Sequence, residues 1–409
     1  MIRYPQVRLK WSVSLRNQKS SGQLPYIGLE HVESWTGRYH PSNDADSFSD
    51  AGSRHFEVGD VLFGKLRPYL AKAIIPRTSG SCTSELLVLR PSAYDKRFLL
   101  YWLLAPQFID EVDSSTYGAQ MPRASWDFIG NVASPLPPLP TQRAIADFLD
   151  RKTAAIDALI EKKERLIALL AEKRAALIHR AVTKGLDSNV PMKESGVEWI
   201  GEIPAHWETR RLRYIANRLQ GRLIVQPHLY FEDDGVPIVF GYNIKDGVID
   251  EGGLSKVSFA ADKAHPHARV SAGDLLTVRL GNPGMTAVVP PSLDGCHFAS
   301  IMWIHQHPRV DSGWLCHAMN SPVVQGQIEA ANYGATLGQF NIAVAVDWVL
   351  PFPPKKEQYE IAAFLSHQLS TIAKVRNRIA EQLDRLREYR QALITAAVTG
   401  QLTIGEAIP

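Results

Sequence analysis

The 409-residue sequence contains only three cysteines, Cys82, Cys296 and Cys316. Their number is odd and their spacing fits no metal site, so we interpret them as reduced, buried thiols of a cytoplasmic protein. No stretch of 18 residues is free of charge, and the N-terminal MIRYPQVRLKW has no apolar segment of the signal-peptide type. We therefore expect no membrane association.

Excess charge of one sign is also lacking. The chain has 45 Lys and Arg against 42 Asp and Glu, a formal net charge of +3. A DNA-binding domain usually has a clearer basic surface. Charge therefore leaves two alternatives open: the chain does not bind nucleic acid, or partner subunits supply much of the phosphate contact.

Motifs that carry catalysis are missing as well. Gly59–Lys65 fits the first seven positions of a Walker A motif, but Leu66 stands where Ser or Thr must bind Mg²⁺. His305 and His307 have no Cys or carboxylate at ligand spacing to complete a metal site. The Asn/Asp-Pro-Pro-Tyr/Phe tetrapeptide of adenine methyltransferases is absent, and no Gly-rich turn opens a helix. We expect no catalytic residue, no metal and no cofactor in this chain.

The chain does contain a long internal repeat. Residues 135–186 align without a gap to residues 351–402, and 19 of the 52 aligned positions are identical. The two copies are more than 200 residues apart, a spacing too long for a solenoid unit, so the repeat represents the duplication of a whole domain together with its helix. Two similar surfaces in one chain suit a target with two similar parts.

The repeated segments are predicted to be long helices, because neither Gly nor Pro occurs from Thr141 to Thr183 or from Lys355 to Thr399. Apolar residues recur every seven positions, which favours coiled-coil packing of the two helices against each other. Lys163 interrupts this seam, and Leu159, Leu166 and Val375 are expected to widen it. The predicted seam comprises Leu149, Ile156, Leu170 and Leu177 in the first helix, and Leu365, Ile372, Ile379, Leu386 and Leu393 in the second.

The globular parts are duplicated more faintly. The motif Val58–Leu62 matches Ala272–Leu276 at an offset of 214 residues. Short β-rich runs bounded by Gly, Pro or Asp indicate strands, and each copy has a helical segment near its end. The fold class is therefore mixed α/β, with two similar domains separated by the two long helices. The expected segments are a first domain (1–137), a first helix (138–186), a linker (187–208), a second domain (209–352) and a second helix (353–402).

Two loops in each copy carry clusters of polar and aromatic side chains, and loops on a rigid scaffold commonly carry function. One is the turn after the Gly-Asp strand, and the other is the Gly-containing loop before the last strand. Both have a similar setting in the two copies but different polar residues. The candidates are Lys65, Arg67, Tyr69, Thr116, Tyr117, Gln120 and Arg123 in copy one, and Arg279, Asn282, Asn332, Tyr333, Thr336, Gln339 and Asn341 in copy two.

The combination of GDVLF, PLPPLPTQRAIADFL, PFPPKKEQYEIAAFL and SGVEWIGEIPAHWETRRLRYI (195–215) resembles the specificity subunit of Type I restriction-modification enzymes. The resemblance covers nearly the whole chain. It implies a non-catalytic subunit whose two target-recognition domains each read one half of a bipartite, asymmetric site on double-stranded DNA. The polar loop residues are then the candidates for contacts with DNA bases and phosphates, and they differ between the copies as two readers of different half-sites require. The two long helices are expected to form an antiparallel coiled coil that separates the domains and docks two methyltransferase subunits, and a restriction and translocase subunit would join the larger complex. S-adenosylmethionine, ATP and Mg²⁺ are expected on those partners only.

Two other interpretations stay open. A coiled-coil scaffold that joins two protein-binding domains has the same helices, and DNA footprinting separates it from a DNA reader. The other is a methyltransferase fused to its own recognition domains, which the absence of methyltransferase motifs in the sequence disfavours. Binding of S-adenosylmethionine to the isolated chain would support this interpretation. The half-site sequences and the spacer length cannot be deduced from the chain.

Overall fold

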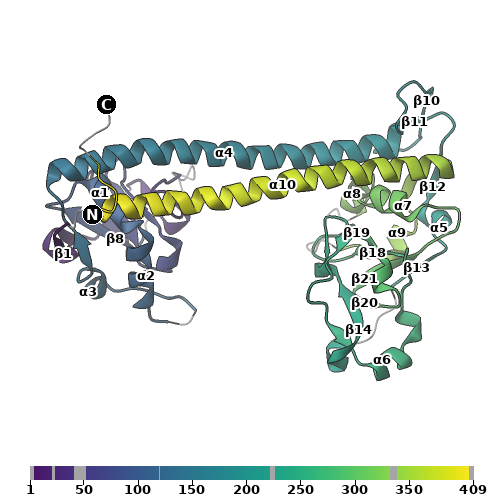
Figure 1. Ribbon diagram of the computed structural model, residues 1–409, viewed down its shortest axis with the longest axis horizontal. Helices are drawn as coiled ribbons and strands as arrows, with labels where there is room; N and C mark the ends of the chain where they lie inside the picture. The colour runs from purple at the N-terminus through teal and green to yellow at the C-terminus, as the bar shows by residue number, and fades with distance from the viewer. Residues whose placement is uncertain are drawn as a thin grey trace. The chain divides into compact units, whose positions relative to one another are not determined.

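The computed structural model describes residues 4–20, 24–40, 52–118, 120–221, 226–331 and 339–404. The chain forms two compact units (Figure 1). Unit 1 contains Met1–Arg165 and Ile379–Pro409, and unit 2 contains Leu166–Arg378. Each unit is a mixed α/β domain together with parts of two long helices, which confirms the predicted fold class.

Unit 1 is built on two small sheets. An antiparallel four-stranded sheet has the order β2-β8-β5-β6, and a three-stranded sheet has the order β3-β7-β4, in which β3 and β7 are parallel. A further pair joins β1 to β9. The elements are β1 (Gln6–Arg8), β2 (Val13–Arg16), β3 (Tyr26–Ile27), β4 (Arg54–Phe56), β5 (Val61–Gly64), β6 (Ala73–Ile74), β7 (Gly80–Cys82), β8 (Leu86–Pro91), α1 (Lys96–Leu103), α2 (Pro106–Ser114), α3 (Trp126–Ile129) and β9 (Ala133–Pro135), with short 3₁₀ turns η1 (Leu9–Trp11), η2 (Leu29–His31) and η3 (Pro68–Leu70).

Unit 2 repeats this arrangement. Its four-stranded antiparallel sheet has the order β13-β21-β18-β19, its β14 and β20 are parallel, and β12 pairs with β22 as β1 does with β9. The elements are β10 (Met192–Glu194), β11 (Glu202–Pro204), β12 (Glu208–Arg211), α5 (Leu212–Ile215), β13 (Arg218–Gln220), η4 (Pro227–Tyr230), β14 (Phe231–Phe240), η5 (Gly241–Asn243), β15 (Ile244–Lys245), β16 (Val248–Ile249), β17 (Lys256–Val257), α6 (Phe259–Ala264), η6 (Pro266–Ala268), β18 (Leu275–Val278), β19 (Thr286–Val288), η7 (Pro291–Leu293), β20 (His297–Ala299), β21 (Ile301–His305), α7 (Ser312–Met319), α8 (Pro322–Ala331), α9 (Ile342–Ala345) and β22 (Val349–Phe352).

The two long helices form as the absence of interior Gly and Pro predicts. Helix α4 spans Leu139–Lys184 and α10 spans Lys355–Val398, 46 and 44 residues long. At 1.5 Å per residue each is roughly 65–70 Å in length. Helix α4 ends before Gly185, whose φ of +71° is a left-handed conformation that glycine adopts without steric cost.

The helices run antiparallel within each unit. In the core of unit 1, Ile145 and Leu149 of α4 pack with Ile394 and Val398 of α10. In the core of unit 2, residues from the end of α4 pack with residues from the start of α10. Each α/β core is thus completed by both helices, because a lone amphipathic helix must bury its apolar stripe against a partner.

Seam positions differ in burial. Leu149 and Leu365 belong to the two domain cores, and Ile156, Ile372 and Ile379 are also buried. The remaining predicted seam residues, Leu170, Leu177, Leu386 and Leu393, are partly buried.

The expectation that Leu159, Leu166 and Val375 widen the seam is wrong, since all three are exposed. The buried stripe also includes the residue four positions after each seam residue, and not the residue three positions after it. A seven-residue repeat alone does not decide between these two spacings. This second row contains Thr153, Ile160, Ile167, Arg174 and Ala181 in α4, and Leu369, Arg376, Leu383 and Arg390 in α10, all buried or partly buried.

The three cysteines are free and buried, as the sequence indicates. Burial raises the pKa of the Cys82, Cys296 and Cys316 thiols to about 12. They are therefore protonated and unreactive at neutral pH.

Candidate nucleic-acid interface

The Gly-Asp motif that the two copies share fixes the start of a central strand. Asp60 and Asp274 are fully buried, and each accepts a backbone hydrogen bond from the residue three positions earlier, at 2.8 Å from Glu57 and 2.9 Å from Ser271. The preceding glycines have φ near +100° and +91°, which other residues adopt only with strain. The motif therefore builds a tight turn, and in each unit the strand that follows it, β5 or β18, leads to the first candidate loop.

In copy one the two predicted loops meet. The amide of Arg67 donates to the carbonyl of Pro122 at 2.7 Å, and the amide of Ala124 donates to the carbonyl of Lys65 at 3.0 Å. A β-bridge joins Leu66 to Arg123 between these bonds. The turn after β5 and the loop before α3 are therefore one surface, although the bridged residues Leu66 and Arg123 are 57 positions apart in the sequence.

Copy two repeats this junction. A β-bridge joins Leu280 to Gln339, the repeat counterparts of Leu66 and Arg123, and Arg279 Nε donates to the carbonyl of Phe340 at 3.4 Å. The candidates Asn332, Tyr333 and Thr336 lie outside the described residues.

Several candidates project from this surface into solvent. In copy one these are Arg67, Tyr69, Tyr117 and Gln120, and in copy two they are Asn282, Gln339 and Asn341. Arg67 has a left-handed backbone with φ of +50°, which is rare for a residue with a side chain and is common where a site is held in a fixed shape. Thr116 and Arg279 are partly buried.

Two candidates make local contacts that account for their polarity. Arg123 forms a forked ion pair with Glu85, with Nε–Oε2 at 3.1 Å and Nη2–Oε1 at 3.2 Å, and this pairing raises the pKa of the guanidinium. Asn341 caps α9 by accepting a hydrogen bond from the amide of Ala343, as its counterpart Ser125 caps α3. Arg123 and Asn341 therefore hold the loops in place. Burial lowers the pKa of nearby Lys65, which Glu85 partly offsets.

The sequence interpretation missed Glu85 and one further feature. Trp11 and Tyr214 are exposed aromatic residues at equivalent places in the two copies. The signal was available, because Leu9-Lys10-Trp11 matches Leu212-Arg213-Tyr214 at an offset of 203 residues.

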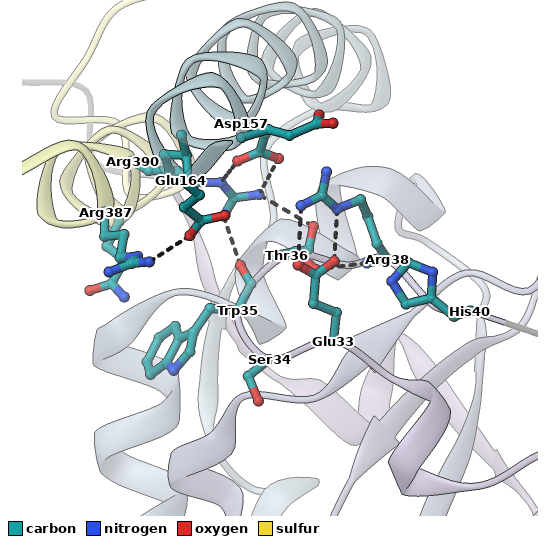
Figure 2. Close-up of a pocket in the computed structure, with 13 residues that line it drawn as sticks. Glu33, Ser34, Trp35, Thr36, Arg38, His40, Asp157, Glu164, Arg387 and Arg390 are labelled. Carbon is teal, nitrogen blue, oxygen red and sulfur yellow. Dashed lines mark hydrogen bonds and ion pairs between the residues drawn. The ribbon is translucent and has the colours of Figure 1, made fainter. Parts of the chain in front are cut away.

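A cavity of about 610 Å³ lies elsewhere in unit 1, between the 33–40 hairpin and the two helices (Figure 2). Its walls carry three ion pairs: Arg38 with Glu33, Arg387 with Glu164, and Arg390 with Asp157. None of the candidate loop residues lines it.

Within the residues that the structure describes, no group of three or more His, Cys, Asp or Glu side chains is placed to hold a metal ion. None of the helices in this described part of the chain is long and apolar enough to cross a membrane.

Comparisons with known proteins agree with this architecture. Residues 10–168 match the family described as the Type I restriction modification DNA specificity domain. The chain is 24% identical over 317 residues to the Type I restriction enzyme EcoBI specificity subunit of Escherichia coli, covering 76% of this chain and 66% of that subunit. It is 22% identical over 358 residues to the MjaVIII specificity subunit of Methanocaldococcus jannaschii, covering 85% of this chain and 77% of the relative.

The fold is also that of a solved structure. A chain from work on complex assembly and conformational transition of the type I R-M system superposes with a TM-score of 0.71 at 20% identity, covering 98% of both chains. The matched part of this chain spans just under two thirds of the EcoBI subunit and 35% of the EcoDI subunit. Residues 10–168 thus match a Type I restriction modification DNA specificity domain, and the chain is similar over most of its length to specificity subunits of Type I restriction enzymes.

Proposed function

We propose that this chain selects the DNA sequence for a Type I restriction-modification complex and has no catalytic activity of its own. Each α/β unit reads one half of a bipartite, asymmetric site on double-stranded DNA. The observation that carries this proposal is the repeated loop junction, which has the same backbone pairing in both copies but different exposed side chains.

A shared backbone with different side chains is what two readers of different sequences need. Base recognition requires Arg, Lys, Asn or Gln held rigidly at the edge of a groove. Gln120 and Arg67 are exposed in copy one, and Gln339 and Asn282 are exposed in copy two. Two surfaces for one identical ligand would carry matching residues instead.

Two methyltransferase subunits are the proposed partners, with a restriction and translocase subunit in the larger complex. S-adenosylmethionine, ATP and Mg²⁺ then belong to those partners. The family match and the relatives support this assignment. The net charge of the chain is only +3, too small to predict tight DNA binding by the chain alone, so partners supply much of the phosphate contact.

DNA footprinting of the chain with and without its methyltransferase subunits tests the proposal. The expected result is protection of one defined sequence in two parts, with a fixed spacer between them. Methylome sequencing of a host that carries the complete system would then give both half-sites. Assembly without any sequence-specific protection would favour the alternative, a coiled-coil scaffold that joins two protein-binding domains.

A further inference from the structure

Trp11 and Tyr214 occupy equivalent, strongly exposed places in the two units. Their side chains are 68% and 69% exposed, and the leucines two residues before them, Leu9 and Leu212, are fully buried. A single exposed aromatic residue is ordinary on a protein surface. Here the same exposure occurs twice, and the local backbone that produces it is repeated.

The backbone repeat is close. Leu9 donates its amide to the carbonyl of Val132 at 3.1 Å, and Leu212 donates to Trp348 at 2.8 Å. The amide of Lys10 donates to the carbonyl of Gly130 at 2.8 Å, and the amide of Arg213 donates to the carbonyl of Val346 at 3.0 Å. These bonds fasten each turn to the segment before β9 or β22, so the aromatic ring is held outward on a fixed support.

Cationic residues accompany both rings. In unit 1 the Arg8 guanidinium lies 5.7 Å from the centroid of the Trp11 ring, and Lys10 precedes Trp11 in the sequence. In unit 2 Arg211 and Arg213 stand at the equivalent positions before Tyr214, and both pair with Asp347. Arg8 bonds Asn131, the repeat counterpart of Asp347, at 3.3 Å in the same way that Arg211 bonds Asp347 at 3.0 Å. The aromatic residue, its two cationic neighbours in the sequence and the contact from Arg8 or Arg211 therefore recur in both copies.

This retention contrasts with the candidate DNA loops, whose polar residues differ between the copies. Half-sites of different sequence require different readers, whereas two identical partners require the same surface twice. Trp, Tyr and Arg are also the residues that dominate binding energy in protein interfaces. Phosphate is a poorer fit, because the Asp347 carboxylate lies among the cations of unit 2 and would repel it.

We propose that the surfaces around Trp11 and Tyr214 each dock one copy of the same protein subunit, which receives the aromatic ring in a pocket. Resting on the proposed function, this inference makes the methyltransferase subunit the occupant of both surfaces. Each aromatic ring is the anchor of its interface.

The test uses the full chain with the methyltransferase subunit of its own system. Trp11→Ala and Tyr214→Ala, singly and together, are compared by native mass spectrometry and by titration of the subunit. Each single variant is expected to hold one subunit normally and the other roughly 30-fold more weakly, as for a hot-spot side chain. The double variant is expected to hold both weakly.

Three controls separate the possible outcomes. Tyr242→Ala removes a ring that is 67% exposed in unit 2 but whose repeat counterpart is Glu30, so assembly should be unchanged. Trp11→Tyr and Tyr214→Trp should assemble like the wild type, because each copy works with the other ring. Unchanged circular dichroism and melting temperature show that the alanine variants are folded.

Wild-type affinity of the double variant for two methyltransferase subunits overturns the inference. So does normal assembly combined with weaker DNA binding, which would make the surfaces DNA contacts. Failure of the wild-type chain to bind the subunit at all would instead overturn the proposed function, together with the inference that rests on it.

Discussion

Arg390 of α10 reaches Asp157 of α4 at 2.8 Å and also donates to the main-chain carbonyls of Trp35 and Thr36, at 2.7 and 3.3 Å (Figure 2). The guanidinium thereby ties the tip of the 33–40 hairpin to both helices of unit 1. Its repeat counterpart, Arg174, donates to the carbonyl of Asp246 at the tip of the β15–β16 hairpin of unit 2. Equivalent arginines from opposite helices thus hold equivalent hairpins.

The two arginines differ in their charge partners. The position equivalent to Asp157 in the second helix is Ala373, so Arg174 has no carboxylate from that place. In unit 2 the carboxylate of Asp246 pairs with Arg376 at 2.7 Å instead. Both arrangements bring the hairpin, α4 and α10 together, but with the acidic residue on a different element.

Removal of Asp157 is predicted to destabilise unit 1 strongly. The side chains of Arg390 and Asp157 are only 6% and 14% exposed, so Asp157→Ala leaves a buried guanidinium without its charge partner. Breaking such a pair costs about 3–5 kcal/mol. Chemical denaturation should show this loss, with faster hydrogen exchange in residues 33–38.

Glu164→Gln is the matched control, because the Arg387–Glu164 pair is 51% exposed on both sides. Its expected cost is below about 1 kcal/mol. If both variants lost the same stability, the ion pair of Arg390 would not be what fastens the hairpin.

Acidic residues in the helix seam are predicted to abolish assembly. Ile372 and Ile379 are both buried in α10, and Ile372→Asp with Ile379→Asp would bury two unpaired carboxylates. Each costs on the order of several kcal/mol before repacking. The expected outcome is loss of the methyltransferase complex while the α/β domains keep their strand signal in circular dichroism.

Val375→Asp provides the control on the same helix, because Val375 is 42% exposed. This variant should assemble normally. Co-purification of the Ile372 and Ile379 double variant with methyltransferase subunits at wild-type stoichiometry would refute the seam assignment.

Unit 2 is predicted to lose stability in mild acid. Burial lowers the pKa of His297 and of His179, and it lowers the pKa of His317 to about 4. An unfolded histidine titrates near 6.5. Below that pH the unfolded chain binds protons that the folded unit does not, so stability falls as the pH drops from about 6.5 toward 4.

Unit 1 has a group that responds at lower pH. Hydrogen bonds from Arg16 and Arg90 hold the pKa of Glu57 at about 2, so its contribution is present above the ordinary glutamate value and lost as the pH falls through 2. Limited proteolysis between pH 7 and pH 4 should therefore cut unit 2 first. His297→Gln and His317→Gln together should flatten that pH dependence, and an unchanged profile would contradict this account.

Much of the fold was predictable because its signals are local. A long run of helix-forming residues without Gly or Pro predicts α4 and α10, and a Gly-Asp pair before an apolar run predicts β5 and β18. The direction in which the seam widens was not predictable, since α4 carries apolar residues at both spacings: Leu159 with Leu166, and Ile160 with Ile167. Only packing against α10 decides between them.

Some features of the candidate site could also be predicted from local sequence signals, and others could not. The shared repeat identified both loops of each copy, but it did not predict that they lie side by side, as the structure shows. The cap made by Asn341 was visible as a polar residue before a helical run. The pairing of Arg123 with Glu85 was not visible, because 38 residues separate them and no sequence pattern links them.

Arg123 and Glu85 are predicted to act as one unit in DNA recognition. Because the ion pair fastens the loop of copy one to the start of β8, Arg123→Ala and Glu85→Ala should weaken the same half-site to a similar degree. The double variant should then be little worse than either single variant, as for two residues that share one interaction. Measuring affinity for the wild-type DNA site in the assembled complex checks this, and additive losses would indicate that Arg123 contacts DNA itself.

Gln120 and Gln339 should affect opposite halves of the recognition site. Both are exposed glutamines of the second candidate loop, Gln120 in copy one and Gln339 in copy two, although Gln339 takes the position of Arg123 in the repeat. Loss of a base contact is worth about 1–3 kcal/mol of discrimination at one position. Gln120→Ala is therefore expected to relax one base preference in the first half-site and to leave the second intact, with the reverse for Gln339→Ala. Binding of the assembled complex to a DNA library randomised in both half-sites measures each preference separately. A phosphate contact would instead weaken binding evenly across sequences and reduce its salt dependence. If either variant altered both half-sites equally, one domain would not read one half-site.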